Sequence, residues 1–202
     1  MTDYFVLLDE WRRPWLEAAA LKSKFMALAA EAHPDKQHNA GELQKAEANR
    51  RYAELNAAYQ CLTEPKSRLL HLLQLERDAK PAEVQKIPSA LANLFAEVAM
   101  TCRNTDAFLA EKNRTTSPLL RAQMFERGQE WVEELRGLQS KLTGLHNKLL
   151  EELKSIDAAW IANPGSNDRV ILLNRLEELY RLFGYFNRWS SQIQERIVQL
   201  SL

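Results

Sequence analysis

The sequence predicts an all-α protein in two parts: an antiparallel helical hairpin at the amino end, then an antiparallel three-helix bundle. Good helix formers dominate its 202 residues, whereas glycine occurs six times and proline seven times. That is too few turn residues for an all-β fold. Apolar residues recur at spacings of three and four along most of the chain, as on the buried face of amphipathic helices.

The amino-terminal domain is expected to cover residues 1–76. Residues 4–8 are apolar and predict a short first helix. A longer helix is expected over residues 14–32, because a proline suits its first turn and the residue before Pro34 disfavours the helical region. Residues 35–41 are polar and predict a loop. The buried stripe expected on this helix comprises Leu21, Phe25, Leu28 and Ala32.

A second long helix follows the loop and is expected to end near residues 63–65, and a short apolar helix should cover residues 69–75. Residues 77–87 contain two charged clusters and Pro81, so we interpret them as the junction to the next domain. The stripe expected on the second long helix comprises Ala48, Tyr52, Leu55, Tyr59 and Leu62.

The carboxyl-terminal domain, residues 88–202, shows three heptad patterns separated by short breaks. Its middle helix should run over residues 118–161, starting at a serine–proline pair, with a turn at 163–166 after it. Three such helices joined by short turns predict an antiparallel bundle. The first helix carries Leu91, Phe95, Val98, Cys102 and Leu109, and the last carries Leu172, Leu176, Leu179, Phe183, Phe186, Ile193, Ile197 and Leu200.

Composition argues against several classes of protein. Lys and Arg number 27, as do Asp and Glu, whereas a general nucleic-acid binder carries a basic excess. No apolar run approaches the ~20 residues needed to cross a bilayer, and the amino end lacks the basic region of a signal peptide. The two cysteines form no CxxC pair, so we expect no disulfide scaffold, no metal site and no cofactor. The expected location is the cytoplasm.

The most informative residues are His33, Pro34 and Asp35. Pro34 fixes its own φ and restricts His33, which makes the loop stiff. Asp35 is a charged acceptor able to bind an arginine of a partner protein. His33 and Asp35 could be read as an acid–base pair, but no nucleophile, metal cluster or glycine-rich phosphate loop accompanies them. An enzyme is therefore not expected.

Four features together resemble the J-domain family of co-chaperones over about residues 3–75. They are the opening Asp3-Tyr4-Phe5, the His33-Pro34-Asp35 loop, the Asn-x-Ala-Tyr run ending at Tyr59, and the Pro-x-x-Arg ending at Arg68. The resemblance implies that the loop docks on a DnaK-type (heat-shock-70) chaperone in its ATP state and stimulates ATP hydrolysis. It also implies a basic docking face, here Lys22 and Lys24 with Lys36 beyond the loop.

The rest of the chain resembles the HscB/Jac family of iron–sulfur co-chaperones. It has no Gly/Phe-rich linker and no CxxCxGxG repeats, and an all-helical domain follows the junction. The resemblance implies that the chain delivers an iron–sulfur cluster scaffold protein to the chaperone. The corresponding surface would comprise Leu91, Leu94 and Phe95 with Glu97, although the spacing of the three apolar residues also suits the bundle core.

Two alternatives stay open. The chain could be a J protein for another client, or a helical scaffolding protein with a degenerate J-domain, since the two turns before the loop carry no lysine or arginine. A homodimer could form through apolar residues off the main stripes. These are Leu119, Leu120, Phe125, Tyr180, Tyr185 and Val198.

Overall fold

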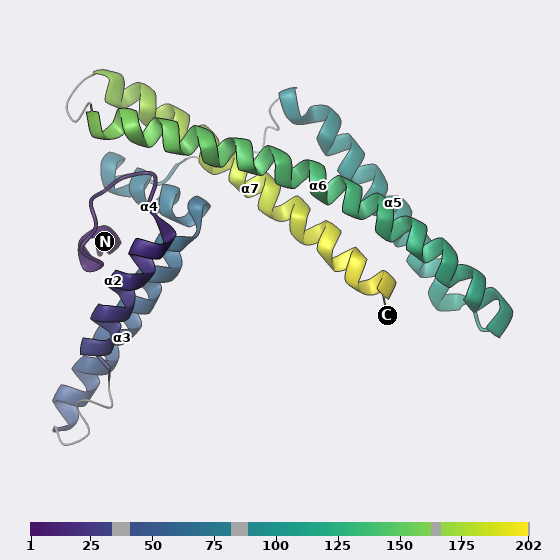
Figure 1. The fold of residues 1–202 in the computed structure, drawn as a ribbon, viewed down its shortest axis with the longest axis horizontal. Helices are drawn as coiled ribbons and strands as arrows, with labels where there is room; N and C mark the ends of the chain where they lie inside the picture. The colour runs from purple at the N-terminus through teal and green to yellow at the C-terminus, as the bar shows by residue number, and fades with distance from the viewer. Residues whose placement is uncertain (34–40, 82–88, 163–166, 202) are drawn as a thin grey trace. The chain divides into compact units, whose positions relative to one another are not determined.

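The computed structural model describes residues 1–33, 41–81, 89–162 and 167–201, and most of them are helical (Figure 1). The predicted all-α class is confirmed. Most of the expected junction and the expected turn at 163–166 lie outside the described residues. The elements are α1 (Tyr4–Leu7), α2 (Ala18–Glu31), α3 (Glu42–Thr63), α4 (Pro65–Arg77), the 3₁₀ turn η2 (Ser89–Leu91), α5 (Ala92–Arg114), α6 (Pro118–Ala162) and α7 (Asn167–Ser201). Among the described helices, none has a stretch long and apolar enough to cross a membrane.

Two long helices take part in two compact units. Unit 1 contains residues 1–82 together with 150–182, and unit 2 contains 83–149 together with 183–202. The last part of α6 and the first part of α7 therefore pack with α1–α4. The rest of both helices packs with α5.

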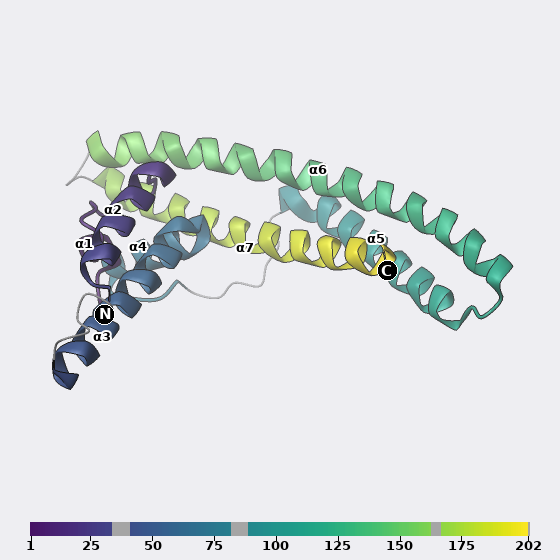
Figure 2. The same ribbon diagram turned by 60° about the horizontal axis from the view of Figure 1, so that its bottom comes forward.

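In unit 1, α2 and α3 run antiparallel and side by side, as both ribbon views show (Figures 1 and 2). Local sequence explains where the shorter helices begin. Asp3 caps α1, because its carboxylate accepts the backbone N–H groups of Phe5 and Val6. Pro65 occupies the first turn of α4, and Glu64 caps that helix by accepting the N–H of Ser67.

Two predicted boundaries are wrong: α4 begins at Pro65 rather than near residue 69, and α2 begins at Ala18 rather than near Pro14. Residues 12–16, which we call the strap, use their backbone groups for other partners. The Pro14 carbonyl accepts the Nε–H of Arg68 at 2.8 Å, and the Trp15 N–H donates to Asp157 at 3.1 Å. A helix that began at Pro14 would need the Pro14 carbonyl to accept the N–H of Ala18, but Arg68 binds that carbonyl, so this tertiary bond overrides the proline signal.

In unit 2, α5 and parts of α6 and α7 form the expected antiparallel bundle. Most of the apolar residues predicted to face the core of this bundle are buried. Trp189 is also buried, next to Ser190, which interrupts the heptad pattern of the last helix. Phe95 is a correction to the stripe, because its side chain is 42% exposed. The core residues of this unit are Val98, Cys102, Phe108, Leu109, Met124, Val132, Leu135, Leu138, Leu142, Phe183, Phe186, Trp189, Ile193, Ile197 and Leu200.

Candidate functional site

The candidate site lies at the end of the α2–α3 hairpin, where α2 stops at Glu31. His33 is half-buried, and its ring meets the edge of Tyr52 on α3 with centroids 5.4 Å apart. That contact fixes the imidazole against the hairpin two residues after α2 ends. The other members of the expected site, Pro34, Asp35 and Lys36, lie outside the described residues.

Aromatic packing holds the hairpin together below His33. Phe25 of α2 stacks on Tyr59 of α3, with centroids 4.3 Å apart and planes 13° apart. Asn56 donates from its side chain to the Tyr52 carbonyl at 2.8 Å, within its own helix. These aromatic contacts therefore align α2 with α3.

The first and last features of the motif also have structural partners. Arg68 is only 3% exposed and donates to the carbonyls of Pro14 and Leu62, and burial lowers the pKa of its guanidinium to about 10. His71 on α4 accepts the backbone N–H of Tyr4 at 3.0 Å and stacks on the Tyr4 ring. Burial lowers the pKa of His71. These bonds tie the amino end to α4 and leave α2 and α3 as the presenting elements.

The two lysines expected on α2 differ in their surroundings. Lys22 is exposed. Lys24 donates to the Asp9 carbonyl at 2.5 Å and pairs with Glu10 at 3.1 Å. Part of the predicted basic face is thus used within the domain, to hold the connection between α1 and α2.

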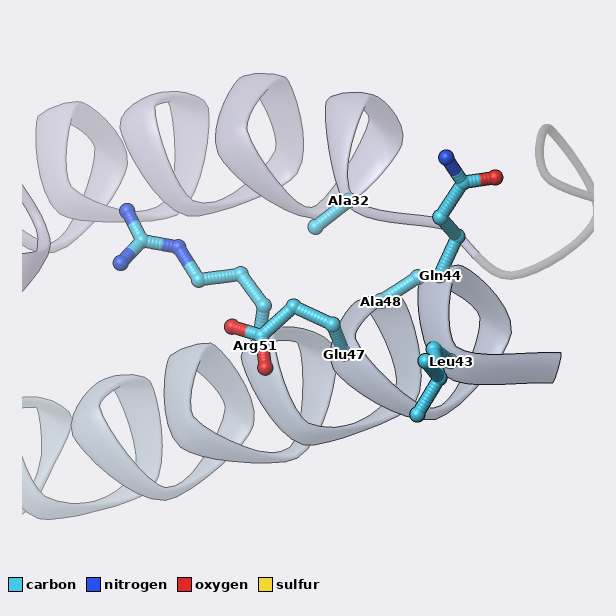
Figure 3. Close-up of a pocket in the computed structure, with 6 residues that line it drawn as sticks. All are labelled: Ala32, Leu43, Gln44, Glu47, Ala48 and Arg51. Carbon is cyan, nitrogen blue, oxygen red and sulfur yellow. The ribbon is translucent and has the colours of Figure 1, made fainter. Parts of the chain in front are cut away.

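A shallow open pocket of about 540 Å³ lies between the end of α2 and the start of α3. Ala32, which directly follows α2, lines this pocket, and Leu43, another lining residue, is 89% exposed. Figure 3 shows the Arg51 guanidinium reaching into the space between the two helices. The residues that line this pocket are Ala32, Leu43, Gln44, Glu47, Ala48 and Arg51.

The residues expected to bind a client lie in unit 2, at η2 and the start of α5. Leu91 and Leu94 are half-buried, and the Phe95 ring packs against Trp189 with centroids 6.2 Å apart. Glu97 pairs with Lys141 of α6 at 2.5 Å. The apolar residues are thus partly accessible, while the carboxylate is already engaged.

Sequence reasoning did not single out Arg51, which lines the pocket between the end of α2 and the start of α3. Whether a cation on a helix is paired depends on which carboxylates its neighbours take, and that is not visible in a linear pattern. Among the described residues, no three His, Cys, Asp or Glu side chains gather closely enough to hold a metal ion.

Comparison with known proteins agrees with this geometry. Residues 14–71 match the family model of the DnaJ domain. Two solved structures share the fold. The chaperone HscB from Vibrio cholerae is 20% identical with a TM-score of 0.58, over 96% of both chains. The human co-chaperone protein HscB is 19% identical with a TM-score of 0.58, over 98% of this chain and 81% of that one. Residues 14–71 are therefore similar to the DnaJ domain, within a chain that has the fold of the HscB co-chaperones.

Proposed function

We propose that the protein is a J-domain co-chaperone that stimulates ATP hydrolysis by a DnaK-type chaperone. The observation that carries the proposal is His33 at the end of an α2–α3 hairpin whose residues match a J-domain. The chain itself makes and breaks no bonds in this scheme. It binds one state of the chaperone better than others, and that differential affinity shifts the chaperone toward hydrolysis.

The test is steady-state ATP hydrolysis by the chaperone with and without the full-length protein. His33→Gln keeps a polar side chain of similar reach but removes the imidazole. We expect this variant to lose stimulation while its helical circular dichroism stays unchanged. Equal stimulation by the variant and the wild type would reject the proposal.

We further propose that the client is an iron–sulfur cluster scaffold protein. The HscB-like fold supports this choice, and so does the partly exposed apolar group of Leu91, Leu94 and Phe95, with Glu97 beside it. Apolar side chains already at the surface can be buried by a partner without unfolding the bundle. The cytoplasm stays the expected place of action.

Titration calorimetry of the scaffold against the full-length protein tests the client. Leu94→Ala and Phe95→Ala should weaken binding, whereas Leu119→Ala, at an exposed leucine of the same unit outside this group, serves as the control. Phe95→Ala is expected to cost about tenfold in affinity, typical of a half-exposed aromatic contact. An absence of binding heat with the wild type would instead favour a J protein that serves another client.

A further inference from the structure

Helix α5, which carries most of the proposed client surface, has three carboxylates, and each of them pairs with a cation on a different helix. The pairs are Glu97–Lys141 at 2.5 Å, Asp106–Arg196 at 2.6 Å and Glu111–Arg127 at 3.5 Å. Pairs of this kind follow from how the helices pack. The sequence of α5 alone therefore overstates the negative charge that a client would meet.

Glu97 and Lys141 form the pair that lies at the proposed client surface. Glu97 follows Leu94 and Phe95 by three and two positions on α5. The side chain of Glu97 is 41% exposed and that of Lys141 is 59% exposed, so both remain within reach of a partner. The Nζ of Lys141 donates to one carboxylate oxygen, Oε1. A client that covers Leu94 and Phe95 therefore meets a carboxylate with a cation already beside it.

The two charges depend on each other because their own helices do not neutralise them. No lysine or arginine lies three or four positions from Glu97, and no aspartate or glutamate lies three or four positions from Lys141. Those are the spacings at which side chains of one helix meet. Lys141 thus supplies the counter-charge that α5 does not provide for Glu97.

We propose that Lys141 sets how strongly a client binds, because it competes within the molecule for the carboxylate of Glu97. This inference rests on the proposed client surface and adds to it a residue that selects among clients. A client segment gains from Glu97 only if its own cation displaces the lysine. An arginine suits this exchange best, since a guanidinium takes both carboxylate oxygens through parallel N–H groups, whereas an ammonium acts as a point charge. The favoured client segment is therefore apolar with an arginine beside its apolar residues.

Solvent exposure limits the strength of this competition. An ion pair whose two side chains both reach water is screened, and it is worth no more than about fivefold in an equilibrium constant. Lys141 should therefore tune client affinity without abolishing it, and its replacement should leave the bundle folded. An effect of this size calls for a control that removes the same charge elsewhere.

The test measures the binding of an iron–sulfur cluster scaffold protein to the full-length protein by titration calorimetry. Lys141→Gln removes the competing cation and should strengthen binding about two- to fivefold. The control is Lys148→Gln, at an exposed lysine seven positions further along α6. It removes the same charge roughly 10 Å away, beyond the Debye length of about 8 Å at physiological salt, so the affinity should change less than about 1.5-fold.

Two further variants separate competition from a structural role. Lys141→Arg keeps the charge but can hold the carboxylate through two N–H groups, so it should weaken client binding about two- to threefold. A structural role would leave the affinity of this variant unchanged. In the Glu97→Gln background, Lys141→Gln should no longer strengthen binding, because the carboxylate for which the lysine competes is gone. The melting temperature of each variant should stay within about 2 °C of the wild type.

The outcomes distinguish this inference from the proposed client. If Lys141→Gln leaves the affinity unchanged or lowers it while Phe95→Ala still weakens binding, the inference is overturned and the proposed client stands. A gain for Lys141→Gln that persists in the Glu97→Gln background would also overturn it. A wild type that gives no binding heat with the scaffold would overturn the inference together with the choice of client, and the His33→Gln comparison would still decide the ATPase proposal.

Discussion

At the scale of single residues, Asp157 is a buried carboxylate of unit 1 that binds two residues of the strap. It is 4% exposed and receives the Arg13 guanidinium through two N–H groups, together with the Trp15 backbone N–H. Trp160, one turn further along α6, donates from its indole to the Arg12 carbonyl at 2.9 Å. The partners lie more than 140 positions apart in the chain, so no local pattern could have predicted that Asp157 would be buried.

Replacing this carboxylate should destabilise unit 1. Asp157→Asn keeps the shape but leaves the Arg13 guanidinium without its counter-charge, at an expected cost of about 2 kcal/mol, because Arg13 stays partly hydrated. Urea unfolding followed by circular dichroism measures this loss.

The control is Glu151→Gln, also on α6, whose pair with Lys154 is exposed. It should cost less than about 0.5 kcal/mol. A loss for Asp157→Asn no larger than that of the control would contradict the role given to Asp157.

His71 makes the stability of unit 1 depend on pH. Burial lowers its pKa in the folded protein, with the Asp3 charge opposing and the Arg12 charge assisting that shift. Below the unfolded-state pKa, about 6.5, the unfolded chain binds more protons than the folded one. The stability that neutral His71 contributes is therefore full above that pH and is lost as the pH falls toward the lowered folded pKa.

The free energy of unfolding should thus drop between pH 7.5 and 5.5 in the wild type. It should drop less in His71→Gln, whose side-chain carbonyl can still accept the Tyr4 N–H. The measurement is urea unfolding at several pH values. Identical slopes in the two proteins would show that His71 does not cause the dependence.

At the scale of elements, the existence of the helices could be predicted well, whereas the starts of α2 and α4 could not. Apolar spacing is a local property, and it correctly indicated α3, α4, α6 and α7. The prediction of where α2 starts failed because the strap is bound by Arg68 and Asp157, which are both distant in sequence. The predicted burial of Phe95 was wrong for a related reason. Its heptad position alone does not reveal that the buried Trp189 occupies the neighbouring part of the core.

The long helix α6 contains glycines that serve no visible packing purpose. A methyl group added at Gly137 or Gly144 would meet no atom within 4 Å. Replacement by alanine removes conformational freedom from the unfolded chain, so each change should stabilise the protein by about 0.5 to 1 kcal/mol.

Thermal unfolding of Gly137→Ala and Gly144→Ala checks the sign. Ala158→Gly, at an exposed position of the same helix, should show the reverse effect of similar size. A lower melting temperature for both alanine variants would mean that the glycines are needed for a bend in α6.

At the scale of the whole molecule, the motif could predict the docking loop but not its surroundings. His33 and its neighbours were recognisable because the J-domain places them in a fixed order. The ion pair of Lys24 with Glu10 depends on how α2 packs against the segment after α1, which a linear motif does not reveal. The extent of unit 1 was also hidden, because residues 150–182 join residues 1–82 only through folding.

A fragment of residues 1–82 should therefore be less stable than the same segment in the full chain. It lacks Asp157, Trp160 and Glu177, which bind Arg13, the Arg12 carbonyl and Arg77. Hydrogen exchange of the α1 and strap amides should be at least about tenfold faster in the fragment, because local opening then costs less free energy. Equal protection in the two proteins would show that α6 and α7 add nothing to this segment.

The pairing of the strap with the end of α6 also has a consequence for synthesis on the ribosome. The first 82 residues emerge early, yet the segment that completes their packing ends roughly a hundred residues later. At about 5–20 residues per second, the newborn amino-terminal helices wait roughly 5 to 20 s for it. During that interval, the indole of Trp15 and the guanidinium of Arg13 can contact only solvent or other proteins. We therefore expect the nascent chain itself to need a chaperone until residues 150–182 have emerged.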